Sequence, residues 1–284
     1  MSLPVLRPMT PADVPACMAL KERAGWNQTP RDWLTFIALR PNGCFVATLE
    51  DEIIGTATTV DFEKAFSWIG MMLVSPDHRR KGIGAQLMQA CIDSLADCRT
   101  IKLDATPTGK LLYTTLGFEE EYTLTRMACD AVPARKYRPD NGVRALRPAD
   151  LDEVITFDAA FFGANRGPVL RKWFDNAPQF AYVLREQSRL AGFSMGRAGS
   201  HRSSLGPVVT ETREQAERLI RRALGCVSGK PTVIDIFEHT PAFVTSLEAL
   251  GFSAQRGFTR MYLGPNQAPG IPECQWAIAG PAVG

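Results

Sequence analysis

Hydrophobic and polar positions in the first 130 residues alternate between strand-like and helix-like patterns. We expect strands where apolar and β-branched residues concentrate, at 4–8, 44–49, 53–60, 67–74, 101–105 and 122–129. Helical spacing of apolar residues follows Thr10-Pro11 and Thr29-Pro30, where threonine is the expected N-cap and proline takes the first helical position. Helical spacing returns over 85–96 and 108–116, and Gly117 ends the second of these helices. The predicted order is strand, two helices, three strands, helix, strand, helix, strand.

The second half of the chain repeats the first. A shift of 134 residues superposes three motifs: Thr106-Pro107 on Thr240-Pro241, Leu116-Gly117-Phe118 on Leu250-Gly251-Phe252, and Thr125-Arg126-Met127 on Thr259-Arg260-Met261. Near the domain starts, Leu6-Arg7-Pro8 recurs as Leu146-Arg147-Pro148, with a three-residue difference before the Ala-Asp pair that follows each. Matches at one offset indicate a duplicated domain. We predict a first domain over 1–130, a Pro-rich charged linker over 131–142, and a second domain with a tail over 143–284.

Composition narrows the classes of function. The 284 residues are 45% hydrophobic and 22% charged with a net charge of +2, so neither nucleic acid nor a membrane is an expected partner. The seven cysteines form no C-x-x-C pair and the three histidines are not at ligand spacing, so we expect no disulfide framework and no metal. The N-terminus lacks the pattern of a signal peptide, and no run of apolar residues is long enough for a membrane span. A cytoplasmic protein is expected.

A basic loop with two glycines joins the apolar strand 67–74 to the helix over 85–96. Such a loop points backbone N–H groups at one spot, where the helix dipole is positive, and Gly82 and Gly84 allow close approach of a ligand to the backbone. The positive charges of Arg79, Arg80 and Lys81 suit outer phosphates. The loop therefore predicts a pyrophosphate site, and the alternative is a basic turn that is merely capped by glycines.

The loop does not match the nucleotide P-loop, because no G-x-x-x-x-G-K-[ST] occurs in it. It does not match the dinucleotide fingerprint G-x-G-x-x-G either, because the third glycine is absent. The pattern R-x-x-G-x-G after a strand ending in Leu-Val resembles the acyl-CoA loop of the GNAT acetyltransferase superfamily. The resemblance implies an α/β (α+β) fold of two tandem domains, each a mixed, mostly antiparallel sheet flanked by helices. It also implies acetyl-CoA as co-substrate. Met72, Leu73 and Val74 would then face pantetheine, and the pyrophosphate would lie on Arg79, Arg80, Lys81, Gly82, Ile83, Gly84 and Ala85.

The same resemblance gives Tyr113 a catalytic role. This tyrosine precedes Leu116-Gly117-Phe118 and matches the family tyrosine that protonates the departing CoA thiolate, although packing is the alternative. An attacking amine must be neutral, while a free primary amine has a pKa of about 10, so its proton removal needs help. The strand 67–74 contains no acid, which leaves Glu63, in the turn before it, as the nearest candidate base.

These observations lead to an expected activity: an N-acetyltransferase that transfers an acetyl group from acetyl-CoA to a small-molecule amine by direct attack in a ternary complex. The alternative is a non-catalytic acyl-CoA sensor or scaffold. No R-x-x-G-x-G occurs in the second half, and the 134-residue shift places Leu247 on Tyr113 and Arg218 on Gly84. We expect a degenerate second domain that covers the first domain's edge and walls the acceptor pocket. Because a tandem pair resembles the dimer of single-domain family members, we expect a monomer or a homodimer.

Overall fold

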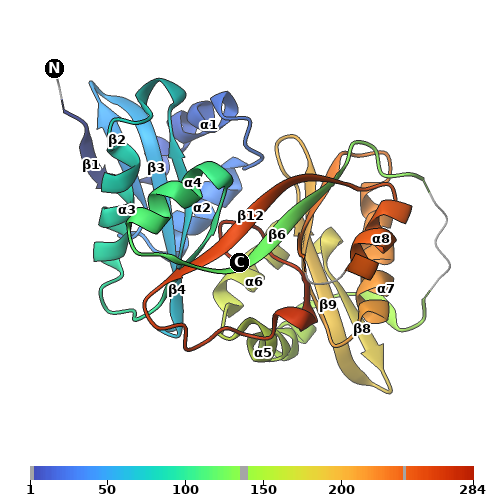
Figure 1. The fold of residues 1–284 in the computed structure, drawn as a ribbon. Helices are drawn as coiled ribbons and strands as arrows, with labels where there is room; N and C mark the ends of the chain where they lie inside the picture. The colour runs from blue at the N-terminus through green and yellow to red at the C-terminus, as the bar shows by residue number, and fades with distance from the viewer. Residues whose placement is uncertain (1–2, 135–139, 239–240) are drawn as a thin grey trace.

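The computed structural model of the protein describes residues 3–134, 140–238 and 241–284. The strands of both halves join in one continuous sheet, and helices cover its faces (Figure 1). Within the described residues this sheet has thirteen strands in the order β1-β2-β3-β4-β5-β12-β6-β11-β10-β9-β8-β7, with β13 paired to β10. None of the helices in these three ranges is both long and apolar enough to cross a membrane.

The first half contains the predicted sequence of elements. Its strands are β1 (Val5–Pro8), β2 (Phe45–Leu49), β3 (Glu52–Phe62), β4 (Phe66–Val74), β5 (Ile101–Ala105) and β6 (Glu119–Cys129). Its helices are α1 (Val14–Arg23), α2 (Pro30–Leu39), α3 (Ile83–Ser94) and α4 (Pro107–Thr115). Thr29 and Asp32 form a capping box at the start of α2, and Gly117, with a φ of 89°, follows the end of α4. The mixed α/β fold is confirmed.

The second half repeats this order. Its strands are β7 (Val143–Ala145), β8 (Tyr182–Glu186), β9 (Arg189–Arg197), β10 (Ser203–Thr210), β11 (Thr232–Phe237), β12 (Ser253–Leu263) and β13 (Gln275–Ala277). Its helices are α5 (Leu151–Phe162), α6 (Gly167–Asn176), α7 (Arg213–Leu224) and α8 (Pro241–Ala249). Part of the predicted linker, 135–139, lies outside the described residues.

One detail of the predicted repeat is wrong. Arg7 binds Asp13 with an N–O distance of 2.7 Å, and Arg144 binds Asp150 in the same way at 2.6 Å, each pair joining the first strand of its half to a short 3-10 helix. Arg144, and not Arg147, is therefore the counterpart of Arg7. The repeat at this point needs no three-residue difference.

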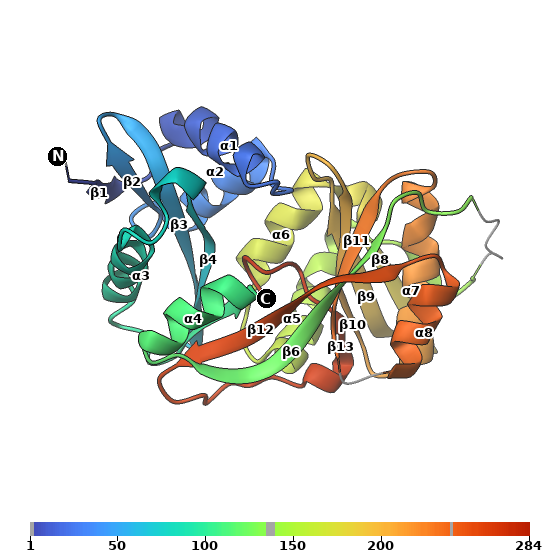
Figure 2. The same ribbon diagram turned by 45° about the horizontal axis from the view of Figure 1, so that its top comes forward.

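The last strands of the two halves are exchanged. We expected residues 122–129 to close the first sheet, but β12 of the second half lies between β5 and β6, and β6 pairs with β11 on its other side. Figure 2 shows β6 and β12 side by side. The arginine of each Thr-Arg-Met motif forms an ion pair with an aspartate of the other half. Arg260 of β12 binds Asp104 of β5 at 2.8 Å, and Arg126 of β6 binds Asp235 of β11 at 2.7 Å. Each half thus completes the sheet of the other.

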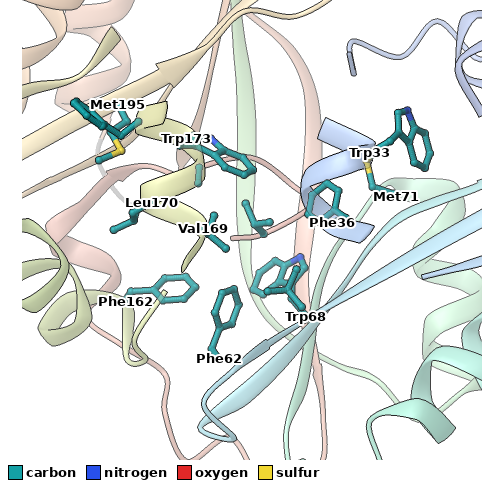
Figure 3. Close-up of a cluster of buried hydrophobic side chains, with 14 of the residues drawn as sticks. Trp33, Phe36, Phe62, Trp68, Met71, Phe162, Val169, Leu170, Trp173 and Met195 are labelled. Carbon is teal, nitrogen blue, oxygen red and sulfur yellow. The ribbon is translucent and has the colours of Figure 1, made fainter. Parts of the chain in front are cut away.

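A shared hydrophobic core joins the halves as well. Trp33, Phe36, Phe62, Trp68 and Met71 of the first half belong to the same buried cluster as five side chains of the second (Figure 3). These five are Phe162, Val169, Leu170, Trp173 and Met195. The rings of Phe62 and Phe162 meet edge to face with centroids 5.2 Å apart. The space between the halves is therefore partly solid core, which fixes the walls of the cavity described next.

Candidate active site

A split between two parallel strands opens the candidate site. The pairing of β4 with β5 consists of Ser67 with Ile101 and Trp68 with Lys102, and the register records no pair of these strands beyond them. A cavity of about 1250 Å³ lies at the split, lined by residues 69–74 of β4 and by Leu103 and Asp104 of β5. Backbone groups at the end of β4 can therefore pair with an extended ligand in place of a strand.

The loop between β4 and α3 borders the same cavity. Gly82 is the N-cap of α3 with a φ of 79°, a conformation that favours glycine. A Cβ on Gly82 would have a single heavy atom within 4 Å, so the backbone is open to a ligand. The Gln86 N–H donates to the Gly82 carbonyl at 3.1 Å, which is the first hydrogen bond of the helix. The N–H groups before Gln86 have no partner within the helix. An open, positively charged helix N-terminus of this kind fits a pyrophosphate.

Most of the predicted cofactor residues line this cavity: Met72, Leu73, Val74, Arg79, Arg80, Gly82, Gly84 and Ala85. The structure does not place Lys81 and Ile83 there. Lys81 donates from Nζ to the Asp77 carbonyl at 3.0 Å, and Ile83 is buried in the core beneath α3. Gly84 has a packing role too, because a Cβ there would lie 3.3 Å from Leu112 of α4.

Tyr113 projects from α4 into the same cavity and is 8% exposed. Burial raises the pKa of Tyr113 above its ordinary value, so the hydroxyl keeps its proton at neutral pH. A Cβ on Gly109 would lie 3.0 Å from the Tyr113 ring, so glycine one turn earlier leaves room for this side chain. A protonated hydroxyl at the cavity wall can act as a general acid.

Glu63 does not join these residues. It lies in the turn before β4, at the opposite end of the strand from Val74, and accepts a hydrogen bond from Asn165 Nδ2 at 2.8 Å. The carboxylates that line the cavity are Asp32 of α2 and Asp104 of β5. Sequence reasoning missed Asp104, although it stands in a predicted strand, because the search for a base followed the strand 67–74 and the turn before it.

The side chain of Asp104 is buried and paired, although the residue borders the cavity. Its two carboxylate oxygens accept from Arg260 Nε and Nη2 at 2.8 and 3.0 Å. Burial raises the pKa of Asp104, and the Arg260 guanidinium opposes that shift. Within the described ranges, no group of three or more His, Cys, Asp or Glu is arranged to hold a metal ion.

The second half forms the other wall of the cavity. Its lining includes Trp173 of α6, Arg197 of β9, and Arg256 and Phe258 of β12. Residues 279–283 of the tail also line it, and Trp68 Nε1 donates to the Pro281 carbonyl at 3.1 Å. No role was predicted for this Pro/Gly-rich tail, because it has no hydrophobic periodicity.

A second split, in the second half, is filled by the chain itself. β10 and β11 pair at Ser203–Thr232 and Ser204–Val233, just as β4 and β5 pair at their start. Beyond these pairs, β13 replaces β11 as the neighbour of β10, since Val208 pairs with Ala277. The Ile278 N–H then donates to the Asp235 carbonyl of β11 at 2.9 Å. A peptide segment thus occupies the space that corresponds to the open split of the first half.

The glycine loop is also missing from the second half. Glu211 and Thr212 alone join β10 to α7, where residues 75–82 join β4 to α3. Thr212 is the N-cap of α7, so the counterpart of Gly84 is Glu214 and not Arg218 as the 134-residue shift predicted. The side chain of Thr212 accepts from the Gln215 N–H, which uses one of the free helix donors. Leu247, the predicted counterpart of Tyr113, is buried in the core.

The splayed parallel strands, the glycine loop at the N-terminus of α3 and the tyrosine on α4 are the features in which the chain resembles the GNAT acetyltransferases. Residues 40–120 match a family model described as an acetyltransferase (GNAT) domain, and residues 154–274 match a second model with the same description. The chain belongs to the GNAT acetyltransferase family and contains two GNAT domains in tandem.

Relatives and solved structures agree with this assignment. Holothin acyltransferase of Pseudoalteromonas sp. is 26% identical over 242 residues, which cover 84% of this chain and 81% of the relative. The crystal structure of an acetyltransferase of Pyrococcus horikoshii superposes with a TM-score of 0.83 at 23% identity, covering 99% of this chain and 96% of that one. A tandem GNAT protein from the clavulanic acid biosynthesis pathway has a TM-score of 0.57 at 16% identity, over 92% and 98% of the two chains. The structures support the tandem fold.

Proposed function

We propose that the protein transfers an acetyl group from acetyl-CoA to the primary amine of a small molecule. One observation carries the proposal. A single cavity contains the strand split, the glycine loop and Tyr113 on one side and a chamber walled by the second half on the other. Two ligands that enter from these two sides meet at the end of β4. Direct attack in a ternary complex is the mechanism that needs such an arrangement.

The chain's own residues divide the work of binding. Acetyl-CoA, when bound, supplies an acetyl group activated as a thioester. The N–H groups at the start of α3, with Arg79 and Arg80, would hold its phosphates. The free edge of β4 near Met72 and Val74 would hold its extended arm by backbone pairing.

Two residues are proposed to handle protons. Tyr113 holds a proton at the cavity wall and gives it to the departing sulfur. Asp104 is the better candidate for the base than Asp32, because it lies on β5, which borders the split, and because burial strengthens its affinity for a proton. Both of its oxygens already bind Arg260, so we propose that it accepts the amine proton through a water molecule.

The test combines turnover with binding. Release of free thiol is followed with acetyl-CoA and a panel of primary amines, while thermal shift measures CoA binding on the same preparation. Thiol release that depends on the amine supports the proposed function. CoA binding without turnover on any amine would instead support an acyl-CoA sensor, the alternative class.

A further inference from the structure

Arginine dominates the acceptor side of the cavity. Arg126, Arg197, Arg202 and Arg256 all line it. Three of them have carboxylate partners: Arg126 binds Asp235, Arg197 binds Asp32 and Arg202 binds Asp130, at 2.7 to 3.0 Å. His201, also in the lining, contacts Glu22. These charges are balanced within the protein, which leaves the fourth arginine to be explained.

Arg256 has no ion pair among the described residues. In the register of β12 and β6 it stands directly opposite Arg126, and the Phe258 ring lies beneath both guanidinium groups, 4.8 Å from Arg256 and 5.3 Å from Arg126. Like charges opposite one another destabilise a sheet. Arg256 is exposed at the cavity wall, and partial desolvation together with the charge of Arg126 lowers the pKa of its guanidinium.

The nearby acid Asp235 offsets this repulsion only in part. Both oxygens of Asp235 already accept from Arg126, at 2.7 and 2.8 Å. One positive charge therefore remains uncompensated on the cavity wall, over an aromatic ring. An anionic ligand would remove the repulsion, and a planar carboxylate matches the fork of an arginine.

We infer that the acceptor amine carries a carboxylate, which binds Arg256 while its amine lies toward the strand split. The inference rests on the proposed function and names its substrate class. Dipeptides and ω-amino acids have this chemistry. Polyamines and aminoglycosides have the opposite charge and are disfavoured by the same uncompensated arginine.

Matched acceptors test the inference. Thiol release is measured for a dipeptide and its C-terminal amide, and for an ω-amino acid and its amide, with the wild type, Arg256→Gln and Arg189→Gln. Arg189 is an exposed arginine paired with Glu211 and does not line the cavity, so it serves as the control. We expect the wild type to prefer each carboxylate about 10- to 100-fold in kcat/KM, the size of a hydrogen bond to a charged group.

In Arg256→Gln this preference should fall to near unity through KM, with kcat and the KM for acetyl-CoA unchanged. The unfolding temperature should stay the same or rise slightly, because the substitution removes the repulsion with Arg126. Arg189→Gln should behave as wild type. Equal use of amides by the wild type, or a preference that survives Arg256→Gln, would overturn the inference while leaving the transferase intact. Calorimetric titration of the same pairs onto CoA-loaded protein measures the preference without turnover. If no amine is acetylated, the proposed function fails, and this titration still decides the anion site.

Discussion

A substitution that removes only the hydroxyl of Tyr113 can separate a catalytic role of this side chain from a packing role. In the described structure this hydroxyl has no hydrogen-bond partner, and Tyr113→Phe removes no atom of the ring that packs near Phe118. We therefore expect the free energy of unfolding to change by no more than about 0.5 kcal/mol. If the hydroxyl protonates the departing thiolate, kcat should fall about 100-fold or more, which is roughly 3 kcal/mol of transition-state stabilisation.

Steady-state kinetics, CoA titration and denaturant unfolding of the two proteins make the test. Because the interaction exists only as the C–S bond breaks, the dissociation constant of CoA should be unchanged. The loss should be smaller with a thioester whose leaving thiol has a lower pKa, because that thiolate needs a proton less. Since burial raises the pKa of Tyr113, the wild-type rate should show no loss from its ionisation up to about pH 10. A rate that falls only in proportion to CoA affinity, or does not fall, would refute the acid role.

Three further predictions concern the cofactor count and the ion pairs. Calorimetry should find one CoA site per chain, because β13 fills the second split; two sites would contradict this. Asp104→Asn should cost about 3–5 kcal/mol in urea unfolding, because it leaves Arg260 buried without its partner, and a cost below ~1 kcal/mol would show that the pair is not structural. The Arg7 guanidinium and the N–H and hydroxyl groups of Thr10 lower the pKa of Asp13 to about 2. Asp13→Asn should therefore lower the free energy of unfolding by about 2 kcal/mol at pH 7. That cost is present above pH ~4 and disappears as the pH falls to about 2; a cost independent of pH would assign it to packing.

Local features of the sequence were sufficient for the order of elements, the glycine loop and Tyr113, because each is specified within a few residues. The neighbours of β6 were not predictable in this way. β6 and β12 carry the same Thr-Arg-Met motif and the same strand pattern, so either can pair with β5 and the choice depends on distant contacts such as Arg260 with Asp104.

The position of Glu63 away from the cavity has a related explanation. Glu63 is near β4 in the sequence, but a strand nine residues long carries it away from Val74. Asp104 is thirty residues beyond Val74 in the chain and reaches the cavity because β5 lies beside β4. Separation along the chain was therefore a poor guide to which acid borders the split. The acids of the strands on both sides of the loop are the residues to consider.

The exchange of β6 and β12 has a consequence for how this protein can change over generations. A half that lacks the glycine loop would ordinarily be free to accumulate substitutions or to be deleted. Here selection on the first half's cavity also acts on residues 253–263, because β12 supplies one of its walls. Recombination that brought in a second half from a relative would replace Arg256 and Arg260 together, and so alter both the charge of the acceptor chamber and the partner of Asp104. Under the proposed function, the half without the glycine loop is thus the part through which acceptor preference can be inherited.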